Sequence, residues 1–171
     1  MMKRLTILRH AKSSWGDPEL DDFDRPLNVR GWNAAKRIGR ELKNRDFRFD
    51  LVVASPAARV RETIDGVREE FDLAAPIHLD QRLYLASNEQ LLALIRELPE
   101  SVERPLFIGH NPGLQELLLA VTVDGGQERS KVQRRFSTAA LAVVDVPANR
   151  WSELECGSGK FVDLLLPKDL D

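Results

Sequence analysis

The sequence predicts an α/β fold, a three-layer α/β/α sandwich around a mostly parallel central sheet. Two observations lead to this fold class. Short apolar runs typical of buried strands alternate along the chain with segments of helical periodicity. The helical segments are also long enough to carry the chain from one parallel strand to the next, so helices should cover both faces of the sheet. At 171 residues the chain is expected to form one domain, residues 1–171.

Five apolar runs are the candidate strands. The run "LVVA" has the continuous apolar character of a strand that is buried on both faces. The runs "RLTIL", "LFIG" and "LAVV" are likewise rich in β-branched or other large apolar residues, whereas "IHL" is short. In chain order the expected strands span residues 3–8, 50–55, 76–79, 105–110 and 138–146.

Four helices are expected between these strands. Asn28 can cap the first, and the sequence from Ser87 to Gln90 has the capping-box pattern that opens the third. Asn111-Pro112 pairs an N-cap residue with proline at the first helical position of the fourth. The apolar residues at helical spacing are Trp32, Ala35, Ile38 and Leu42, then Val60, Ile64, Val67 and Phe71, then Leu91, Leu92, Ile95 and Leu98, and finally Leu114, Leu117, Leu118 and Val121.

Two polar stretches interrupt the alternation, at residues 13–26 and 124–135. Each is long for a connection in a compact domain, and such segments are either functional loops or flexible decoration. The first carries five acidic residues, and we interpret it as a solvated acidic loop rather than a lid over a site. The second is expected to be a loop as well.

Composition narrows the classes of function. Basic and acidic residues number 25 and 27, so the net charge of −2 gives no basic field for nucleic acid or for an anionic membrane. No apolar run is long enough for a signal peptide or a membrane span. The single cysteine, Cys156, excludes an internal disulfide and fits a reducing compartment, which favours a cytoplasmic location. No carboxylates or cysteines occur at metal-ligand spacing, so divalent-metal chemistry is not indicated.

Cationic and imidazole side chains follow several predicted strands. Arg9 and His10 come at the end of the first strand, and His110 closes the run "LFIGH" before a helix. Arg59 falls in the first turn of the helix after the second strand. Because ligands bind outside the carboxyl ends of parallel strands, these four side chains should meet at one edge, close to helix N-termini that favour an anion. The remaining histidine, His78, is expected to be an ordinary surface residue.

This set of side chains suits phosphoryl transfer. The guanidinium groups match the oxygens of a phosphoryl group in bidentate fashion. A neutral imidazole is a competent nucleophile, and a second, protonated imidazole can stabilise the charge on the transferred group. The sequence has no P-loop pattern, which argues against nucleotide hydrolysis by that route.

The segments "LRHAKSSW", "DRPLNVRG", "SPAARVRET" and "LFIGHNPGL" together resemble the histidine phosphatase superfamily, and within it the SixA-type phosphohistidine phosphatases. The resemblance extends from residue 3 to about residue 166, with the motifs in the expected order. It implies a phosphoglycerate mutase-like fold and catalysis without a cofactor.

The resemblance also implies a role for each matching residue. His10 would be the nucleophile that becomes phosphorylated, and Arg9, Arg59 and His110 would bind the phosphoryl oxygens. Arg59 is chosen over Arg61 because it stands four residues before a threonine, as the arginine of the family does. Arg61 is then expected to form a surface ion pair.

One departure from the family bears on the substrate. Many members have a glutamate general acid or base in the segment that here reads "LDQRLYLAS", where alignment places Gln81. Glutamine cannot transfer a proton, and an alkoxide leaving group needs a proton donor more than a phosphorylated imidazole does. This favours a P–N substrate, the phosphohistidine of a protein. The alternative is a small phosphoester, with the adjacent Asp80 as the acid.

The short chain has little room for the insertions that enclose small substrates, which also favours an open site and a protein substrate. Ser13 is expected to be a further donor at the phosphate pocket, and Arg25 and Arg134-Arg135 are candidates for its rim or else ordinary surface charges. A phosphate-binding module without turnover remains an alternative, although mere binding has no need of a histidine in the nucleophile position. A mutase is disfavoured, since it must protect its phosphoenzyme from water.

Overall fold

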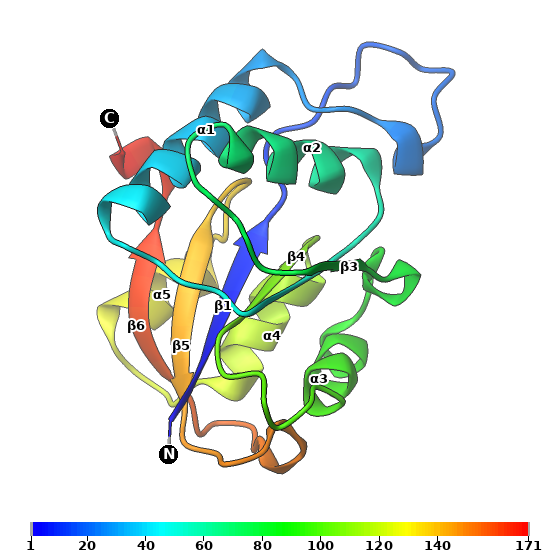
Figure 1. Ribbon diagram of the computed structural model, residues 1–171. Coiled ribbons are helices and arrows are strands. Elements are labelled where there is room, and N and C mark those ends of the chain that lie inside the picture. The colour runs from blue at the N-terminus through cyan, green and yellow to red at the C-terminus, as the bar shows by residue number, and fades with distance from the viewer. Residues whose placement is uncertain (1, 171) are drawn as a thin grey trace.

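A computed structural model describes residues 2–170 and shows a six-stranded mixed sheet (Figure 1). The strands lie in the order β3-β2-β4-β1-β5-β6. Their bounds are β1 Lys3–Arg9, β2 Leu51–Ala54, β3 Ile77–Leu79, β4 Pro105–Gly109, β5 Leu141–Val146 and β6 Lys160–Leu165. The five expected strands are thus present with small shifts at their ends, and β6 is an addition that the sequence did not predict.

The sheet is parallel over β3, β2, β4 and β1, and β5 and β6 continue it in antiparallel pairing. The parallel part brings the carboxyl ends of β1, β2 and β4 to one edge of the sheet. Within it, Arg9 of β1 stands in register with Gly109 of β4. The residues that directly follow these two partners therefore leave the sheet side by side.

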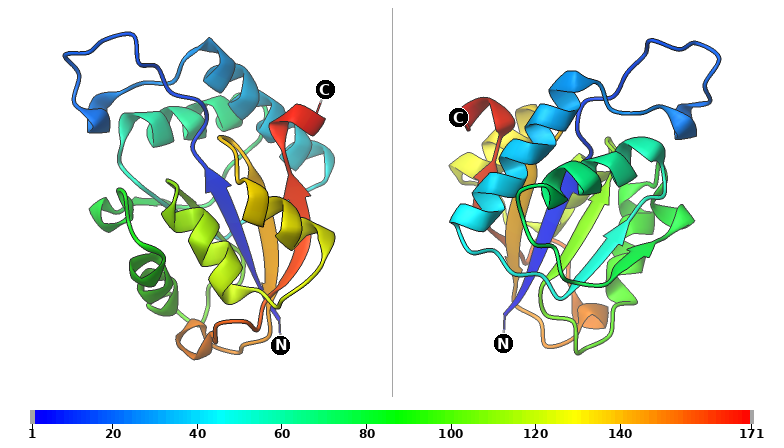
Figure 2. Two further views of the ribbon diagram at one scale, coloured as in Figure 1. Left: turned by 180° about the vertical axis from the view of Figure 1, so that it is seen from behind. Right: turned by 45° about the horizontal axis from the view of Figure 1, so that its top comes forward.

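Helices cover both faces of the sheet, as the sequence predicts (Figure 2). α1 and α2 pack against each other on one face, and α3, α4 and α5 cover the other. Their bounds are α1 Val29–Asn44, α2 Ala58–Arg68, α3 Asn88–Arg96, α4 Gly113–Val121 and α5 Gln127–Arg134. Each face has its own cluster of buried aliphatic and aromatic side chains, so the sheet is sandwiched between two apolar layers.

The predicted caps of α1 and α3 are confirmed. The Asn28 side chain accepts a hydrogen bond from the Gly31 N–H, and Ser87 and Gln90 form both bonds of a capping box. The prediction for α4 was one residue out, because Pro112 is the N-cap and the helix begins at Gly113. Asn111 instead precedes a cis peptide bond, and its side-chain oxygen accepts the Gln115 N–H.

The expectation of a loop over residues 124–135 is wrong, because this stretch contains α5. Val132 is the one buried residue of that helix, so its sequence has almost no apolar periodicity. The helix is held instead by polar contacts with α4. The Gln115 side chain donates to the Val132 carbonyl oxygen, and Arg129 donates to the carbonyl oxygen of Leu119. Such bonds exist only once the two helices lie together.

The polar segment after β1 projects from the edge of the sheet that carries the site (Figure 1). It returns at Asn28, whose N–H donates to the carbonyl oxygen of Lys12. The first turn of α1 packs so closely here that a Cβ on Gly31 would lie 2.1 Å from that same oxygen. Glycine is required at this position by the approach of two backbones, and the contact fixes the start of the segment that follows His10.

Candidate active site

Two histidines face each other at the carboxyl edge of the sheet. His10 follows β1 and His110 follows β4, directly after the register pair that joins these strands. The His10 N–H donates to the Gly109 carbonyl oxygen at 3.0 Å, which extends the ladder one residue beyond the strand. The two ring centroids lie 5.2 Å apart. The predicted convergence of the strand ends is therefore present in the structure.

The His10 ring has a defined orientation. Its Nδ1 lies 2.7 Å from the Ala11 carbonyl oxygen, which can only accept a hydrogen bond, so Nδ1 carries the proton and Nε2 keeps its lone pair. Burial, together with the nearby charges of Arg59, Arg9 and Arg25, lowers the pKa of His10 to about 4 and outweighs the opposing effect of this hydrogen bond. At neutral pH the ring is therefore uncharged, and its Nε2 can act as a base or nucleophile.

His110 is held by a residue that the sequence analysis did not single out. Its Nε2 lies 2.8 Å from Oγ of Ser55, the residue that follows β2. Burial and the neighbouring His10 and Arg59 lower the pKa of His110 to about 3. The expectation of one neutral and one protonated histidine therefore does not hold for the site by itself, since both rings are uncharged at neutral pH.

Arg9 and Arg59 both lie at this site, as predicted. Arg9 donates to the Phe136 carbonyl oxygen at 3.1 Å, and the Asn111 side chain donates to the same oxygen. Nε of each arginine and Nδ1 of His110 are buried without a hydrogen-bond partner. Buried polar nitrogens are rarely left unpaired, because each loses its bonds to water. Three such atoms on residues of one pocket indicate a site built for an anion.

Asp22 connects the acidic segment with the site, which corrects the interpretation of that segment as merely solvated. Its carboxylate and backbone oxygens accept two hydrogen bonds from Arg59, at 2.9 and 2.6 Å. The Tyr84 hydroxyl and Arg25 Nε also donate to the carboxylate. Burial by itself would raise the pKa of Asp22, but these hydrogen bonds and the charge of Arg59 lower it to about 2. The carboxylate therefore stays ionised and cannot supply a proton near neutrality.

Arg25 and Ser13 support the segment that borders the site. Arg25 is buried, donates to Oγ of Ser13 at 2.8 Å, and stacks its guanidinium on the Trp15 ring. The interpretation of Arg25 as an ordinary surface charge is thus wrong. Thr63 of α2 ties the same region to the helix, because its hydroxyl accepts the Ala11 N–H and donates to the Arg59 carbonyl oxygen.

Asp80 and Gln81 lie outside this pocket. The Arg82 guanidinium holds the Asp80 carboxylate through three hydrogen bonds of 2.8 to 3.3 Å and lowers the pKa of Asp80. The structure therefore gives no support to Asp80 as a general acid. Arg61 is exposed as expected, but it donates to the Pro56 carbonyl oxygen instead of forming an ion pair. His78 is exposed on β3, as predicted.

The pocket has a volume of about 330 Å³. Its lining contains all four predicted central residues as well as Ser13 and Arg25. The full lining is Arg9, His10, Lys12, Ser13, Trp15, Arg25, Arg59, Leu85, His110, Asn111 and Thr138. The lining includes six cationic or imidazole-bearing side chains but no carboxylate. Among residues 2–170, no three His, Cys, Asp or Glu side chains gather closely enough to hold a metal ion.

Residues 5–104 match the family described as the histidine phosphatase superfamily (branch 1). This match contains Arg9, His10 and Arg59 and covers more than half of the chain. The chain belongs to the histidine phosphatase superfamily. The resemblance identified from the sequence motifs is thereby confirmed, and with it the phosphoglycerate mutase-like α/β fold.

Relatives match nearly the whole chain. An uncharacterized protein of Mycobacterium leprae is 31% identical over 94% of this chain and all of its own length. A structure from Agrobacterium tumefaciens, assigned to the phosphohistidine phosphatase SixA, is 31% identical with a TM-score of 0.81 and covers 96% of this chain and 98% of that one. A protein histidine phosphatase SixA complexed with tungstate shares the fold, with 21% identity, a TM-score of 0.80, and coverage of 97% and 98% of the two chains.

These neighbours support a phosphatase. None of the helices within residues 2–170 has the length and apolar character needed to cross a bilayer. The match to the family ends before His110, so the place of that histidine in the site rests on the strand register and the ring contact described above.

Proposed function

We propose that the protein is a metal-independent phosphohistidine phosphatase that works through a phosphohistidine on His10. One observation carries the proposal. Buried nitrogens of Arg9, Arg59 and His110 lack partners in the same pocket in which His10 keeps a free Nε2 lone pair. The arrangement combines donors for the phosphoryl oxygens with a nucleophile for the phosphorus.

In the first step, the Nε2 lone pair of His10 attacks phosphorus in line with the leaving group. A P–Nε2 bond forms as the bond from phosphorus to the substrate nitrogen breaks. The substrate ring, which carries a proton from solvent on its other nitrogen, takes that electron pair and departs as neutral imidazole. The Ala11 carbonyl oxygen keeps the ring correctly turned and stabilises the positive charge that phosphorylation places on it. Arg9 and Arg59 offset the charge on the transferred group.

In the second step, a water oxygen attacks phosphorus and the P–Nε2 bond breaks. Inorganic phosphate leaves, the water proton passes to solvent or phosphate, and His10 recovers its lone pair. His110 would donate from Nδ1 in both steps. Oγ of Ser55 accepts the Ala57 N–H, so its own proton is available for Nε2 of His110, which leaves the ring proton on Nδ1.

The lining of the pocket favours a P–N bond over a phosphoester. It contains no carboxylic acid, and the pKa values of its two histidines, about 4 and 3, leave neither protonated at pH 7. An alkoxide leaving group would find no strong proton donor, whereas an imidazole leaves without one more readily.

A protein substrate fits the surroundings of the pocket. Trp15 and Leu85 line its rim with 77% and 56% of their surfaces exposed. Single exposed apolar residues are common, but two that flank one polar pocket are typical of a surface that contacts a partner. We therefore propose that the phosphorylated residue belongs to another protein.

A substrate panel tests the proposal. We expect kcat/KM to decrease from a phosphohistidine peptide through phosphoramidate and an aryl phosphate to a sugar phosphate, and quenched reactions to trap acid-labile phosphate on His10. A preference for sugar phosphates would overturn the choice of substrate but not the mechanism. Phosphate binding without turnover of any substrate would favour the binding-module alternative.

A further inference from the structure

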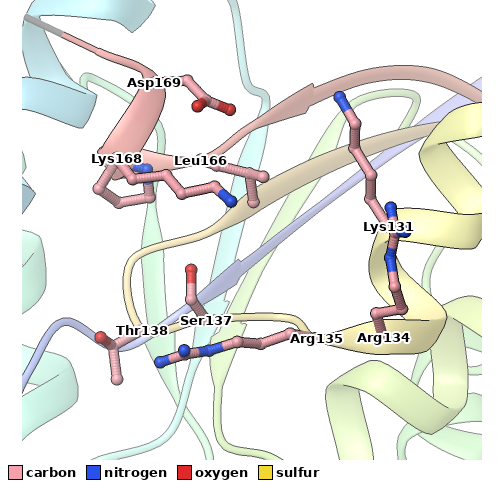
Figure 3. A pocket seen from close by; sticks show the side chains of 9 residues that line it. Lys131, Arg134, Arg135, Ser137, Thr138, Leu166, Lys168 and Asp169 are labelled. Carbon is pink, nitrogen blue, oxygen red and sulfur yellow. The ribbon is translucent and has the colours of Figure 1, made fainter.

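A second, larger cavity opens beside the catalytic pocket, and we refer to it as the basic pocket. It has a volume of about 520 Å³. Its lining consists of Lys131, Arg134, Arg135, Ser137, Thr138, Leu166, Pro167, Lys168 and Asp169. Figure 3 shows cations on opposite sides of the space, with Lys131 and Arg134 on α5 and Lys168 on the C-terminal turn after β6.

The basic pocket concentrates charge that the protein leaves unpaired. Lys131, Arg134, Arg135 and Lys168 are all exposed, and none of them has an ion-pair partner within residues 2–170. Asp169 is the one carboxylate of the lining, so cations exceed anions by four to one. Mutual repulsion of this kind is relieved by binding an anion.

The two pockets are adjacent. Thr138 lines both of them, and Arg135 and Ser137 of the same short segment, residues 135–138, line the basic pocket; we call this segment the wall. Two residues of the catalytic pocket hold this wall, since Arg9 and Asn111 both donate to the Phe136 carbonyl oxygen. Burial, followed by the charges of Arg135 and Arg59, lowers the pKa of Arg9. A molecule that places a phosphoryl group beside His10 can therefore reach the basic pocket as well.

We propose that the basic pocket docks an acidic segment of the protein that carries the phosphorylated histidine. This inference rests on the proposed function and adds a specificity-determining surface to it.

The construction of the basic pocket favours acidic side chains over a compact phosphate. A buried phosphate cradle uses helix N-termini and fixed guanidinium forks, and the catalytic pocket has such a fork in Arg59. Here the neighbouring helix end is the C-terminal end of α5, which presents carbonyl oxygens rather than the N–H donors of a phosphate cradle, and the cations are long, exposed side chains. Flexible exposed cations steer and hold a charged protein surface, with strong dependence on salt.

The test compares two synthetic phosphohistidine peptides that differ only in having glutamate or glutamine on both sides of the histidine. The basic-pocket variant combines Lys131→Gln, Arg134→Gln and Lys168→Gln, and it leaves Arg135 in place because its charge acts on Arg9. We expect kcat/KM of the parent protein to be about tenfold higher for the glutamate peptide at low salt. The variant should lose that preference, mainly through KM, while its kcat/KM for the glutamine peptide stays within about twofold of the parent value.

A matched control variant removes the same charge elsewhere. Lys43→Gln, Arg68→Gln and Lys160→Gln change exposed cations at the ends of α1 and α2 and at the start of β6, far from the site edge of the sheet. It should keep the preference for glutamate. The inference would be overturned if the control variant lost the preference for the glutamate peptide to the same extent. It would also be overturned if kcat/KM of the basic-pocket variant fell equally for both peptides. Strong inhibition by inorganic pyrophosphate that the basic-pocket variant relieves would overturn it as well, because the occupant would then be a small polyanion.

Failure of the proposed function would give a different result. If neither phosphohistidine peptide is hydrolysed while an aryl phosphate is, the choice of substrate is wrong. The docking surface is then tested by fluorescence anisotropy with the unphosphorylated glutamate peptide, which should bind the parent and the control variant in a salt-sensitive way. Absence of that binding, or equal binding to the basic-pocket variant, would contradict the docking surface independently of catalysis.

Discussion

The catalytic pocket and the basic pocket share a wall but use cations in opposite ways. Arg59 is 3% exposed and its guanidinium is fixed by two bonds to Asp22, whereas Arg134 and Lys168 are exposed and unpaired. The catalytic pocket leaves buried nitrogens without hydrogen-bond partners, which suits the binding of one small anion. The basic pocket presents charge over a wide opening.

The contrast shows that burial, more than residue type, determines what an arginine contributes. A buried guanidinium acts at short range and low effective dielectric, where geometry matters and salt matters little. An exposed one acts at longer range and is screened within about 10 Å at 0.1 M salt. The catalytic pocket should therefore tolerate salt but not substitution, and the basic pocket should behave in the reverse manner.

The largest expected effect comes from His10→Asn. Loss of the nucleophile should lower kcat/KM for an aryl phosphate by roughly 10⁴-fold or more, because the remaining pocket can bind phosphate but cannot be phosphorylated. Initial rates and trapping of radiolabelled phosphoenzyme measure this. His78→Asn, at the exposed histidine of β3, is the matched control and should leave both unchanged. Parental rates in His10→Asn would refute the assignment of the nucleophile.

Arg59→Lys probes the fixed guanidinium. A lysine keeps the charge but loses the planar fork that bonds Asp22 and that we propose binds the phosphoryl oxygens, so kcat/KM should fall by about 10²–10³-fold. Arg61→Lys, two residues along α2 on an exposed side chain, should change the rate less than about twofold. A similar loss in both variants would mean that the helix, and not the buried fork, was disturbed.

The uncharged histidines predict a pH-dependent stability. In the folded protein the pKa values of His10 and His110 are about 4 and 3, below the 6.5 of an ordinary histidine, so the unfolded chain binds more protons between these values. Stability is therefore complete above pH 6.5 and declines as the pH falls toward 4. As the pH falls from 7 to 5, each histidine should lower the free energy of unfolding by about 2 kcal/mol.

Urea denaturation at pH 7 and pH 5 measures this decline, because most carboxylates remain ionised over that range. His110→Asn should show a smaller decline than the parent protein, by about the contribution of one histidine. An equal decline in parent and variant would indicate that His110 is protonated in the folded protein.

The smallest effect is expected at the basic pocket. Lys168→Gln alone should reduce kcat/KM for the glutamate peptide by no more than about fivefold, since a single exposed ion pair contributes about 1 kcal/mol or less. Raising the salt concentration from 0.05 to 0.5 M should abolish this difference but change the rate with an aryl phosphate little. Salt dependence of equal size for the two substrates would remove the distinction between the two pockets.

The sequence by itself predicted the central residues of the candidate site. Arg9, His10, Arg59 and His110 were predicted because strand ends and helix starts can be recognised from apolar runs and caps, and parallel strands deliver such ends to one edge. The same rule points to Ser55, which directly follows β2, so this residue of the site was also accessible from the sequence.

Only the tertiary structure decided which distant residues hold these side chains in place. Asp22 meets Arg59 across 37 positions of sequence and Tyr84 across 62, through a loop whose acidic composition suggested no more than solvation. α5 is held by polar contacts with α4 and has almost no apolar periodicity, and β6 joins the edge of the sheet by pairing with β5. Local patterns report which face of an element is buried, but they carry no information about which distant segment will supply its hydrogen-bond partners or its neighbouring charges.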